Sequence, residues 1–343
     1  MVVSSQLKRV YFEKEALDYP AGRQIYQRMQ DDGQKVEFLQ SHNRVTGIPG
    51  KSPREAFFQG KSTLVVGVRK TLAFATCKPS AHYQLPLVTG CQGICEYCYL
   101  NTQLGKKPYI RIYVNVEDIL DQAAILIEKR RPEITLFEAS ATSDPVAVEP
   151  YSGSLARAIA FFAEQEYGRL RFVTKFTCVD SLLTLKHNNH TRIRFSINSD
   201  QVIRSYEHRT PPLQQRLQAL SRIVGAGYPS GVIIAPVILN EGWQQDYKTL
   251  LGAVAEHIDY QPGMDFTFEV ISHRFTSRAR SNILGVFPQT DLPMDEKIDR
   301  KYKYGQFGYG KYIYTDDKLA EMKSFFKEEI SESFPQSSIN YLI

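Results

Sequence analysis

The chain has 343 residues, of which 43% are hydrophobic and 23% are charged. This composition is ordinary for a globular protein and allows one large α/β domain or two modest ones. The net charge of +5 permits contact with nucleic acid without requiring it. No apolar run is long enough to span a membrane and no signal peptide is visible, so the composition excludes a membrane protein and predicts a cytoplasmic one.

The first part of the chain, residues 1–80, is predicted to be an accessory region. Helical spacing predicts a helix over Ala21–Gln34, and a β-branched run predicts a strand over Ser62–Val68. Turn residues are frequent over Ser41–Ser52.

Residues 81–280 alternate strands with helices and form the predicted main domain. Alternation of this kind indicates a parallel sheet with helices outside it, here a partial (β/α)6 barrel, with reactive groups at the carboxyl ends of the strands. The predicted strands are Tyr83–Val88, Ile134–Ala139, Arg169–Lys175, Arg192–Ile197, Gly231–Pro236 and Phe266–Ile271, and the predicted helices are Tyr113–Arg130, Ser154–Glu166, Leu213–Gly225 and Trp243–His257.

Residues 281–343 are predicted to be a C-terminal extension. Basic and aromatic residues alternate around glycines over Lys297–Tyr314, which predicts a β-hairpin. A helix over Asp317–Glu328 and a short strand over Ile339–Leu342 complete the chain.

Three of the five cysteines lie close together in a C-x3-C-x2-C motif, Cys91, Cys95 and Cys98. An odd, clustered set is unsuited to disulfides and suited to a metal centre. Three thiolates can hold a [4Fe–4S] cluster and leave one iron open for S-adenosylmethionine. The alternative is structural zinc, whose fourth ligand would have to be Cys77, Cys178 or a histidine, none at a familiar spacing.

The cysteine spacing, with an aromatic residue just before the last cysteine, resembles the radical S-adenosylmethionine superfamily. Further blocks along nearly the whole chain resemble the spore photoproduct lyase family within it. These blocks are Lys61–Leu72, Cys95–Thr102, Lys107–Asn115, Tyr167–Phe176, Arg194–Asn198, Ala235–Trp243, His273–Thr276 and Gly310–Tyr314.

The resemblance implies DNA repair in the spore or germinating cell. A 5′-deoxyadenosyl radical takes a hydrogen atom from the lesion 5-thyminyl-5,6-dihydrothymine, and two thymines result. It further implies that Tyr97 and Tyr99 return the radical to S-adenosylmethionine and that flavodoxin or ferredoxin supplies electrons. The implied contacts to S-adenosylmethionine are Tyr97, Ser143, Lys175, Ser196 and Ala235.

One position departs from the family pattern. The family has a hydrogen-donating cysteine directly before Thr-Ser-Asp, whereas this chain has Ala141 before Thr142-Ser143-Asp144. A deliberate replacement that traps substrate and a natural divergence both account for Ala141, and the intact flanking blocks favour replacement. Cys178, just past a predicted strand end, is the alternative hydrogen donor.

A lesion that joins two adjacent bases must be flipped out of the duplex before an enzyme can reach it. Basic residues can hold phosphates and tyrosines can stack on bases. The predicted DNA contacts are Arg274, Lys303, Tyr304, Lys311 and Tyr312, with Gln306 where a basic residue is expected. The alternatives are a radical enzyme that acts on RNA or a small molecule, and a damage-binding protein without catalysis.

Overall fold

A computed structural model describes residues 7–42, 45–304 and 310–343. The chain divides into two compact units. Unit 1 comprises Met1–Gln92 and Leu104–Ile193, and unit 2 comprises Gly93–Gln103 and Arg194–Ile343. Among the described residues, no helix has both the length and the apolar composition that crossing a membrane requires. The three regions inferred from composition stay a prediction.

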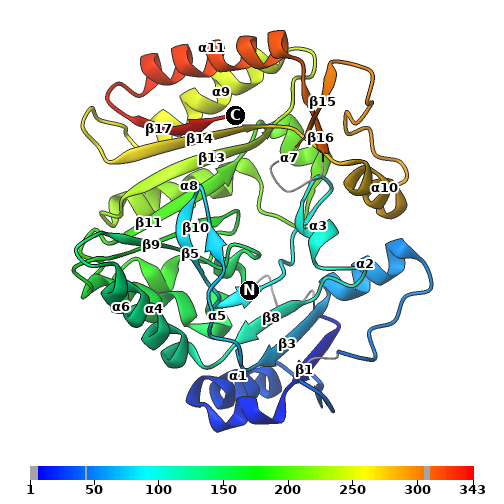
Figure 1. The fold of residues 1–343 in the computed structure, drawn as a ribbon, viewed down its shortest axis with the longest axis vertical. Helices are drawn as coiled ribbons and strands as arrows, with labels where there is room; N and C mark the ends of the chain where they lie inside the picture. The colour runs from blue at the N-terminus through cyan, green and yellow to red at the C-terminus, as the bar shows by residue number, and fades with distance from the viewer. Residues whose placement is uncertain (1–6, 43–44, 305–309) are drawn as a thin grey trace. The chain divides into compact units, whose positions relative to one another are not determined.

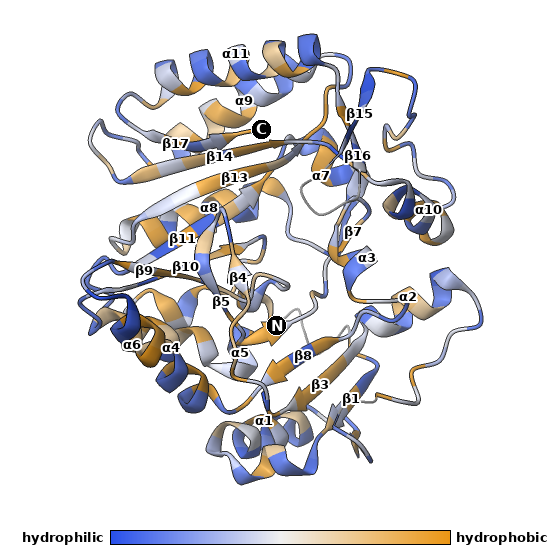
Figure 2. Cartoon of the chain, in the orientation of Figure 1, coloured by the Kyte–Doolittle hydropathy of each residue, from blue (hydrophilic) through white to orange (hydrophobic). Residues whose placement is uncertain are grey.

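The first sheet of unit 1 has the order β2-β1-β3-β8-β6, with only β6 antiparallel to its neighbour. Figure 2 shows β3 mostly in the hydrophobic colour. The strands are β1 (Arg9–Phe12), β2 (Val36–Phe38), β3 (Thr63–Gly67), β6 (Val88–Thr89) and β8 (Ile110–Tyr113), and the helices are α1 (Pro20–Asp31) and α2 (Pro53–Lys61). The predicted helix and strand of the first 80 residues are confirmed as α1 and β3.

The sequence did not predict β8, and the helix expected from Tyr113 in fact begins at Val116. The strand has only four residues and includes Arg111, whose guanidinium pairs with Glu13 at 2.9 Å. A buried charge of this kind breaks the apolar run by which a buried strand is recognised.

The second sheet of unit 1 contains β4 (Thr76–Cys77), β5 (Ala81–Leu85), β9 (Thr135–Ala139) and β10 (Gly168–Thr174), in the order β10-β9-β5-β4. Strands β5, β9 and β10 are parallel. Helices α4 (Val116–Arg130) and α6 (Ser154–Ala163) lie beside one another next to these strands (Figure 1). The apolar side of α4, with Ile119, Ala123 and Ile127, is buried as the helical spacing predicts.

Strand β11 (Thr191–Ile197) begins in unit 1 and ends in unit 2. Unit 2 continues with the parallel strands β13 (Ser230–Val237), β14 (Phe266–Ser272) and β17 (Ser338–Leu342). Its longer helices are α8 (Leu213–Gly225), α9 (Trp243–His257) and α11 (Asp316–Ser333). Helix α9 packs on α11 through ring contacts of Trp243 with Phe325 and of Tyr247 with Phe326.

The predicted hairpin is confirmed as β15 (Arg300–Tyr304) and β16 (Gly310–Tyr314), which pair antiparallel. Residues 305–309, including Gln306, lie outside the described part of the chain. The shorter elements of unit 2 are β7 (Ile94–Cys95), α3 (Leu100–Gln103), α7 (Asp200–Tyr206), β12 (Glu207–His208) and α10 (Ser277–Val286).

Candidate functional site

A tight loop follows β9 in unit 1 and carries Ala141. Ser140 has a left-handed backbone with φ of 52°, and its amide donates to the Leu85 carbonyl at 2.8 Å. Its hydroxyl oxygen accepts from the Val88 amide at 3.0 Å. The half-buried Ala141 is therefore held at the carboxyl end of β5 and β9, as the α/β pattern predicts.

The same loop is joined to the residue before Cys91. The Gly90 amide donates to the Thr142 carbonyl at 3.0 Å, and the Ser143 hydroxyl donates to the Gly90 carbonyl. On the other side, the ammonium of Lys61, which is buried, donates to the Cys91 carbonyl at 2.9 Å. The backbone on both sides of the Cys91 α-carbon is thus fixed within unit 1.

Asp144 connects this loop to the end of β10. One carboxylate oxygen accepts from the Thr174 hydroxyl at 2.7 Å, and the other accepts from the Lys175 amide at 2.7 Å. Unit 1 therefore brings together four predicted site residues, Cys91, Ala141, Ser143 and Lys175, at neighbouring strand ends.

The other two cysteines of the motif lie in unit 2, on a segment that pairs with β12. Cys95 is opposite Glu207 in the short antiparallel ladder. The Glu96 amide donates to the Tyr206 carbonyl at 2.9 Å, and the Cys98 amide donates to the Cys95 carbonyl at 3.2 Å. Cys95 is buried and Cys98 is half-buried, and these main-chain hydrogen bonds hold the backbone around both thiols.

The two predicted catalytic tyrosines have different surroundings. Tyr97 donates its hydroxyl proton in a short hydrogen bond to Glu207, whereas Tyr99 is 56% exposed. Burial raises the pKa of the Tyr97 phenol well above its ordinary value, and the negative charge of Glu207 adds to the shift.

Sequence reasoning missed Glu207 and its partner Arg216. The Arg216 guanidinium contacts the Glu207 carboxylate at 2.6 Å and donates to the carbonyl of Ser196 at 3.1 Å. Ser196 is buried near the end of β11, and Ala235 lies half-buried in β13. The available signal was an arginine on the apolar side of α8, beside Leu217 and Leu220, where a free charge would be costly.

The predicted DNA contacts lie in unit 2 at and beside the hairpin. Burial lowers the pKa of the Lys311 ammonium, and the nearby charges of Arg274 and Lys303 lower it further. These three cations therefore form one basic group. Tyr304 is 78% exposed, whereas Tyr312 stacks on Phe275 with ring centroids 5.3 Å apart. The Tyr304 ring has an edge-to-face contact with Tyr302, with centroids 5.1 Å apart, but it is exposed enough to stack on a base.

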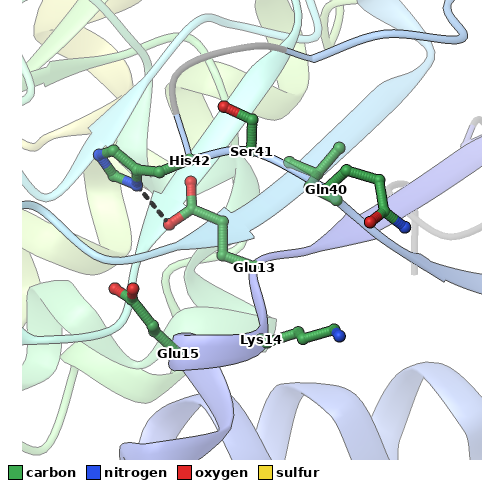
Figure 3. Close-up of a pocket in the computed structure, with 7 residues that line it drawn as sticks. Glu13, Lys14, Glu15, Gln40, Ser41 and His42 are labelled. Atoms are coloured by element: carbon green, nitrogen blue, oxygen red, sulfur yellow. Dashed lines mark hydrogen bonds and ion pairs between the residues drawn. The ribbon is translucent and has the colours of Figure 1, made fainter.

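A polar cavity of about 210 Å³ lies elsewhere in unit 1 (Figure 3). Its wall includes the Glu13 carboxylate, which contacts His42 at 2.8 Å, Arg111 at 2.9 Å and the Val68 amide at 3.0 Å. Its lining residues, Glu13, Lys14, Glu15, Leu39, Gln40, Ser41 and His42, include none of the predicted site residues. Because the Glu13 carboxylate already has these three partners, we assign no chemistry to this cavity.

The chemistry of the cysteine segment fits a bound cofactor. None of the five cysteines, all of which lie in the described part of the chain, forms a disulfide bond. Four buried polar atoms of the segment have no hydrogen-bond partner within the described residues, and they are Gln92 Nε2 and Oε1, Glu96 Oε2 and Asn101 Oδ1. Groups of this kind are rare unless a water, an ion or a ligand satisfies them. Among the described residues, no three His, Cys, Asp or Glu side chains are grouped as a metal site would require, so the assignment of Cys91, Cys95 and Cys98 as ligands stays a prediction from the motif.

Comparison with known proteins gives a consistent result. The family model described as spore photoproduct lyase matches residues 6–343. The spore photoproduct lyase of Clostridium acetobutylicum is 51% identical over 341 residues, covering 99% of this chain and 100% of that protein. The enzyme of Bacillus subtilis is 46% identical over 332 residues, covering 97% of each.

Solved structures agree with the sequence matches. A mutant spore photoproduct lyase with bound AdoMet and dinucleoside spore photoproduct is 48% identical, with a TM-score of 0.93 over 98% of this chain and 99% of that one. Another, complexed with dinucleoside spore photoproduct, is 47% identical, with a TM-score of 0.92 over 98% of each chain. The predicted partial-barrel α/β fold of the radical S-adenosylmethionine type is confirmed. The chain belongs to the spore photoproduct lyase family.

Proposed function

We propose that this chain acts on the spore photoproduct in UV-damaged DNA as a radical S-adenosylmethionine carbon–carbon lyase, or as a form of that enzyme in which hydrogen return is impaired. The observation that carries the proposal is full-length similarity to solved relatives, one of which holds both AdoMet and the dinucleoside lesion. The strand-end arrangement of Cys91, Ala141, Ser143 and Lys175 in unit 1 supports it.

Cys91, Cys95 and Cys98 would hold the [4Fe–4S] cluster. With S-adenosylmethionine bound, the cluster supplies a 5′-deoxyadenosyl radical. The residues of the chain would bind S-adenosylmethionine and orient it. The Lys175 ammonium suits the methionine carboxylate because it is a compact charge with three donors. The further proposed contacts to S-adenosylmethionine are Tyr97, Ser143, Ser196 and Ala235.

Tyr97 and Tyr99 would serve the return of the hydrogen atom. The phenol of Tyr97 has its hydroxyl directed at Glu207, and Tyr99 is the more exposed of the two. Position 141 is the proposed place of the hydrogen donor. Alanine has no S–H bond, so lesion opening can occur without the normal return step. A solved cysteine-to-alanine mutant of spore photoproduct lyase holds the dinucleoside lesion, which supports a trapping role for such an alanine.

The basic group at the hairpin would hold the DNA backbone. Arg274, Lys303 and Lys311 supply positive charge, and the exposed ring of Tyr304 can stack on a base beside the flipped lesion. We propose Tyr312 as a support for this surface, because its ring is stacked on Phe275. The electron donor is proposed to be flavodoxin or ferredoxin in the cytoplasm of the germinating cell.

The test is anaerobic reconstitution of the cluster, followed by incubation with S-adenosylmethionine, a reductant and a dinucleotide that carries the lesion. We expect 5′-deoxyadenosine and consumption of the lesion, with thymine products altered by Ala141. A protein that binds lesion-bearing DNA yet never cleaves S-adenosylmethionine would instead be a damage-binding protein, which Ala141 makes the second candidate.

A further inference from the structure

Unit 2 contains a fully buried ion pair that stability does not explain. The side chains of Glu207, in β12, and Arg216, in α8, are both 0% exposed, and their charged atoms are 2.6 Å apart. Removing two charges from water is costly, and apolar residues of similar volume often serve a core as well or better. We therefore look for the role of this ion pair in the residues that Glu207 and Arg216 contact.

The Glu207 end of the pair holds the cysteine segment. One carboxylate oxygen accepts a hydrogen bond from the hydroxyl of Tyr97, which lies between Cys95 and Cys98. The main chain of Glu207 also pairs with Cys95. One residue thus fixes this segment through both its backbone and its side chain.

The Arg216 end of the pair reaches the end of β11. Its Nη1 donates to the Ser196 carbonyl at 3.1 Å, while Nη2 also donates to the Thr210 hydroxyl at 2.8 Å and Nε donates to the Pro211 carbonyl at 2.8 Å. A planar guanidinium held at several points has one orientation, and it imposes that orientation on the carboxylate it contacts.

We propose that Glu207 and Arg216 are positioning residues for the S-adenosylmethionine site: together they align Tyr97 of the cysteine segment with Ser196 of β11. The inference rests on the proposed function, in which Tyr97 and Ser196 contact S-adenosylmethionine. Neither Glu207 nor Arg216 needs to touch the cofactor, since each acts through a residue that does. At metal sites, loss of a residue that holds a direct ligand lowers metal affinity or activity 10- to 100-fold, and we expect the lower end of this range for a residue that holds a cofactor contact.

The test measures S-adenosylmethionine binding to the reduced, reconstituted protein from the change that it causes in the cluster EPR spectrum. Glu207→Gln keeps the shape and an acceptor oxygen but removes the charge that aligns the side chain. We expect the dissociation constant to rise about tenfold with unchanged iron content. In a Tyr97→Phe protein, the same substitution should add little, because two residues that act through one contact are not additive.

A matched control is the ion pair of Arg194 and Glu269 in the same unit. It is equally buried, with a separation of 2.7 Å and exposures of 1% and 0%, and it joins β11 to β14. Glu269→Gln should lower stability and leave the dissociation constant within about twofold. If Glu207→Gln yields little folded protein, Thr210→Val removes a neutral contact to Arg216 and should shift binding in the same direction.

Two results would overturn the inference. One is a Glu207→Gln protein that binds S-adenosylmethionine as tightly as the parent. The other is a rise in the dissociation constant that Glu269→Gln also causes, or that Glu207→Gln still causes in full in the Tyr97→Phe protein. Failure of the proposed function has a different signature, because the reconstituted parent protein would then show no spectral response to S-adenosylmethionine.

Discussion

At position 141, one side chain determines how the proposed reaction ends. The position is half-buried in a loop whose backbone is held by hydrogen bonds of Ser140 and Ser143. Because these contacts involve neighbouring residues, a side chain with one additional sulfur atom can be introduced without changing them. We expect Ala141→Cys to convert a mixture of by-products into mainly two repaired thymines, measured by chromatography of the reacted dinucleotide.

Cys178 provides the control for this experiment. Burial raises the pKa of its thiol, so it too carries a hydrogen atom at neutral pH. Cys178→Ala should leave the product pattern of the Ala141→Cys protein unchanged. Equal and clean yields from the parent and Ala141→Cys proteins would exclude position 141 as the donor site.

Gly90, next to the first cysteine of the motif, can be tested by stability alone. Its φ is +75°, and an added Cβ would lie 2.1 Å from the Tyr109 carbonyl oxygen. Gly90→Ala must therefore move backbone, and we expect a loss of roughly 3 kcal/mol or more in the free energy of unfolding.

Gly105 separates the two causes of this loss, which are the left-handed backbone and the steric clash. It has nearly the same φ, +76°, but among the described residues no atom beyond its chain neighbours lies within 4 Å of the added Cβ. Gly105→Ala should cost about 1 kcal/mol, from backbone conformation only. Urea unfolding of both variants checks the difference, and equal losses would contradict the steric explanation.

At the scale of elements, the hairpin is attached to the sheet of unit 2 through Arg300. This residue begins β15, donates to the carbonyl and to Nδ1 of His273 at 2.8 and 3.0 Å, and lies 3.7 Å from the ring centroid of Tyr314. Burial lowers the pKa of His273 to about 3, and the charge of Arg300 contributes. The imidazole is therefore neutral in the folded protein.

This arrangement predicts a pH dependence of stability. The unfolded chain protonates His273 near pH 6.5, whereas the folded chain does so only near pH 3. Stability from this group is full above pH 7 and falls as the pH drops below 6.5, by about 2 kcal/mol at pH 5. In His273→Asn, whose side chain does not titrate, the difference in unfolding free energy between pH 8 and pH 5 should shrink by about that amount. An unchanged difference would assign the pH dependence to other groups.

Helices α2 and α9 both have a recognisable sequence signal, but only the signal of α9 led to a prediction. Helix α2 was missed although its signal is present: the Ser52 hydroxyl oxygen accepts from the Glu55 amide, and Glu55 accepts from the Lys51 amide. A serine followed three residues later by glutamate is a helix-start pattern. Helix α9, by contrast, was predicted over its full length because its apolar spacing is regular.

For the whole molecule, binding to DNA depends on where the positive charges lie more than on the net charge. The net charge of +5 is modest, yet Arg274 and Lys303 are both close enough to Lys311 for their charges to lower its pKa. Each phosphate contact contributes about 0.9 to the slope of log binding constant against log salt concentration. We expect Lys303→Gln to reduce that slope by about this amount on lesion-bearing duplex DNA, measured by fluorescence anisotropy.

Lys186→Gln is the matched control for that measurement. The Lys186 side chain is 73% exposed and pairs with Glu164 in unit 1, so its loss changes net charge by the same amount. A slope that falls equally in both variants would show that net charge, and not the hairpin, governs binding to DNA.

Sequence patterns alone were enough for six strands and four helices of the main α/β region, for the cysteine motif, for the family resemblance and for the departure at Ala141. Each of these is a spacing or periodicity between residues close together along the chain, and such patterns survive without coordinates. The folded structure was needed to show that Glu207 accepts a hydrogen bond from Tyr97, 110 residues away, and that Arg300 donates a hydrogen bond to the imidazole of His273. Whether a charged side chain is solvated or buried against a partner depends on how distant segments pack, and no local pattern encodes that pairing.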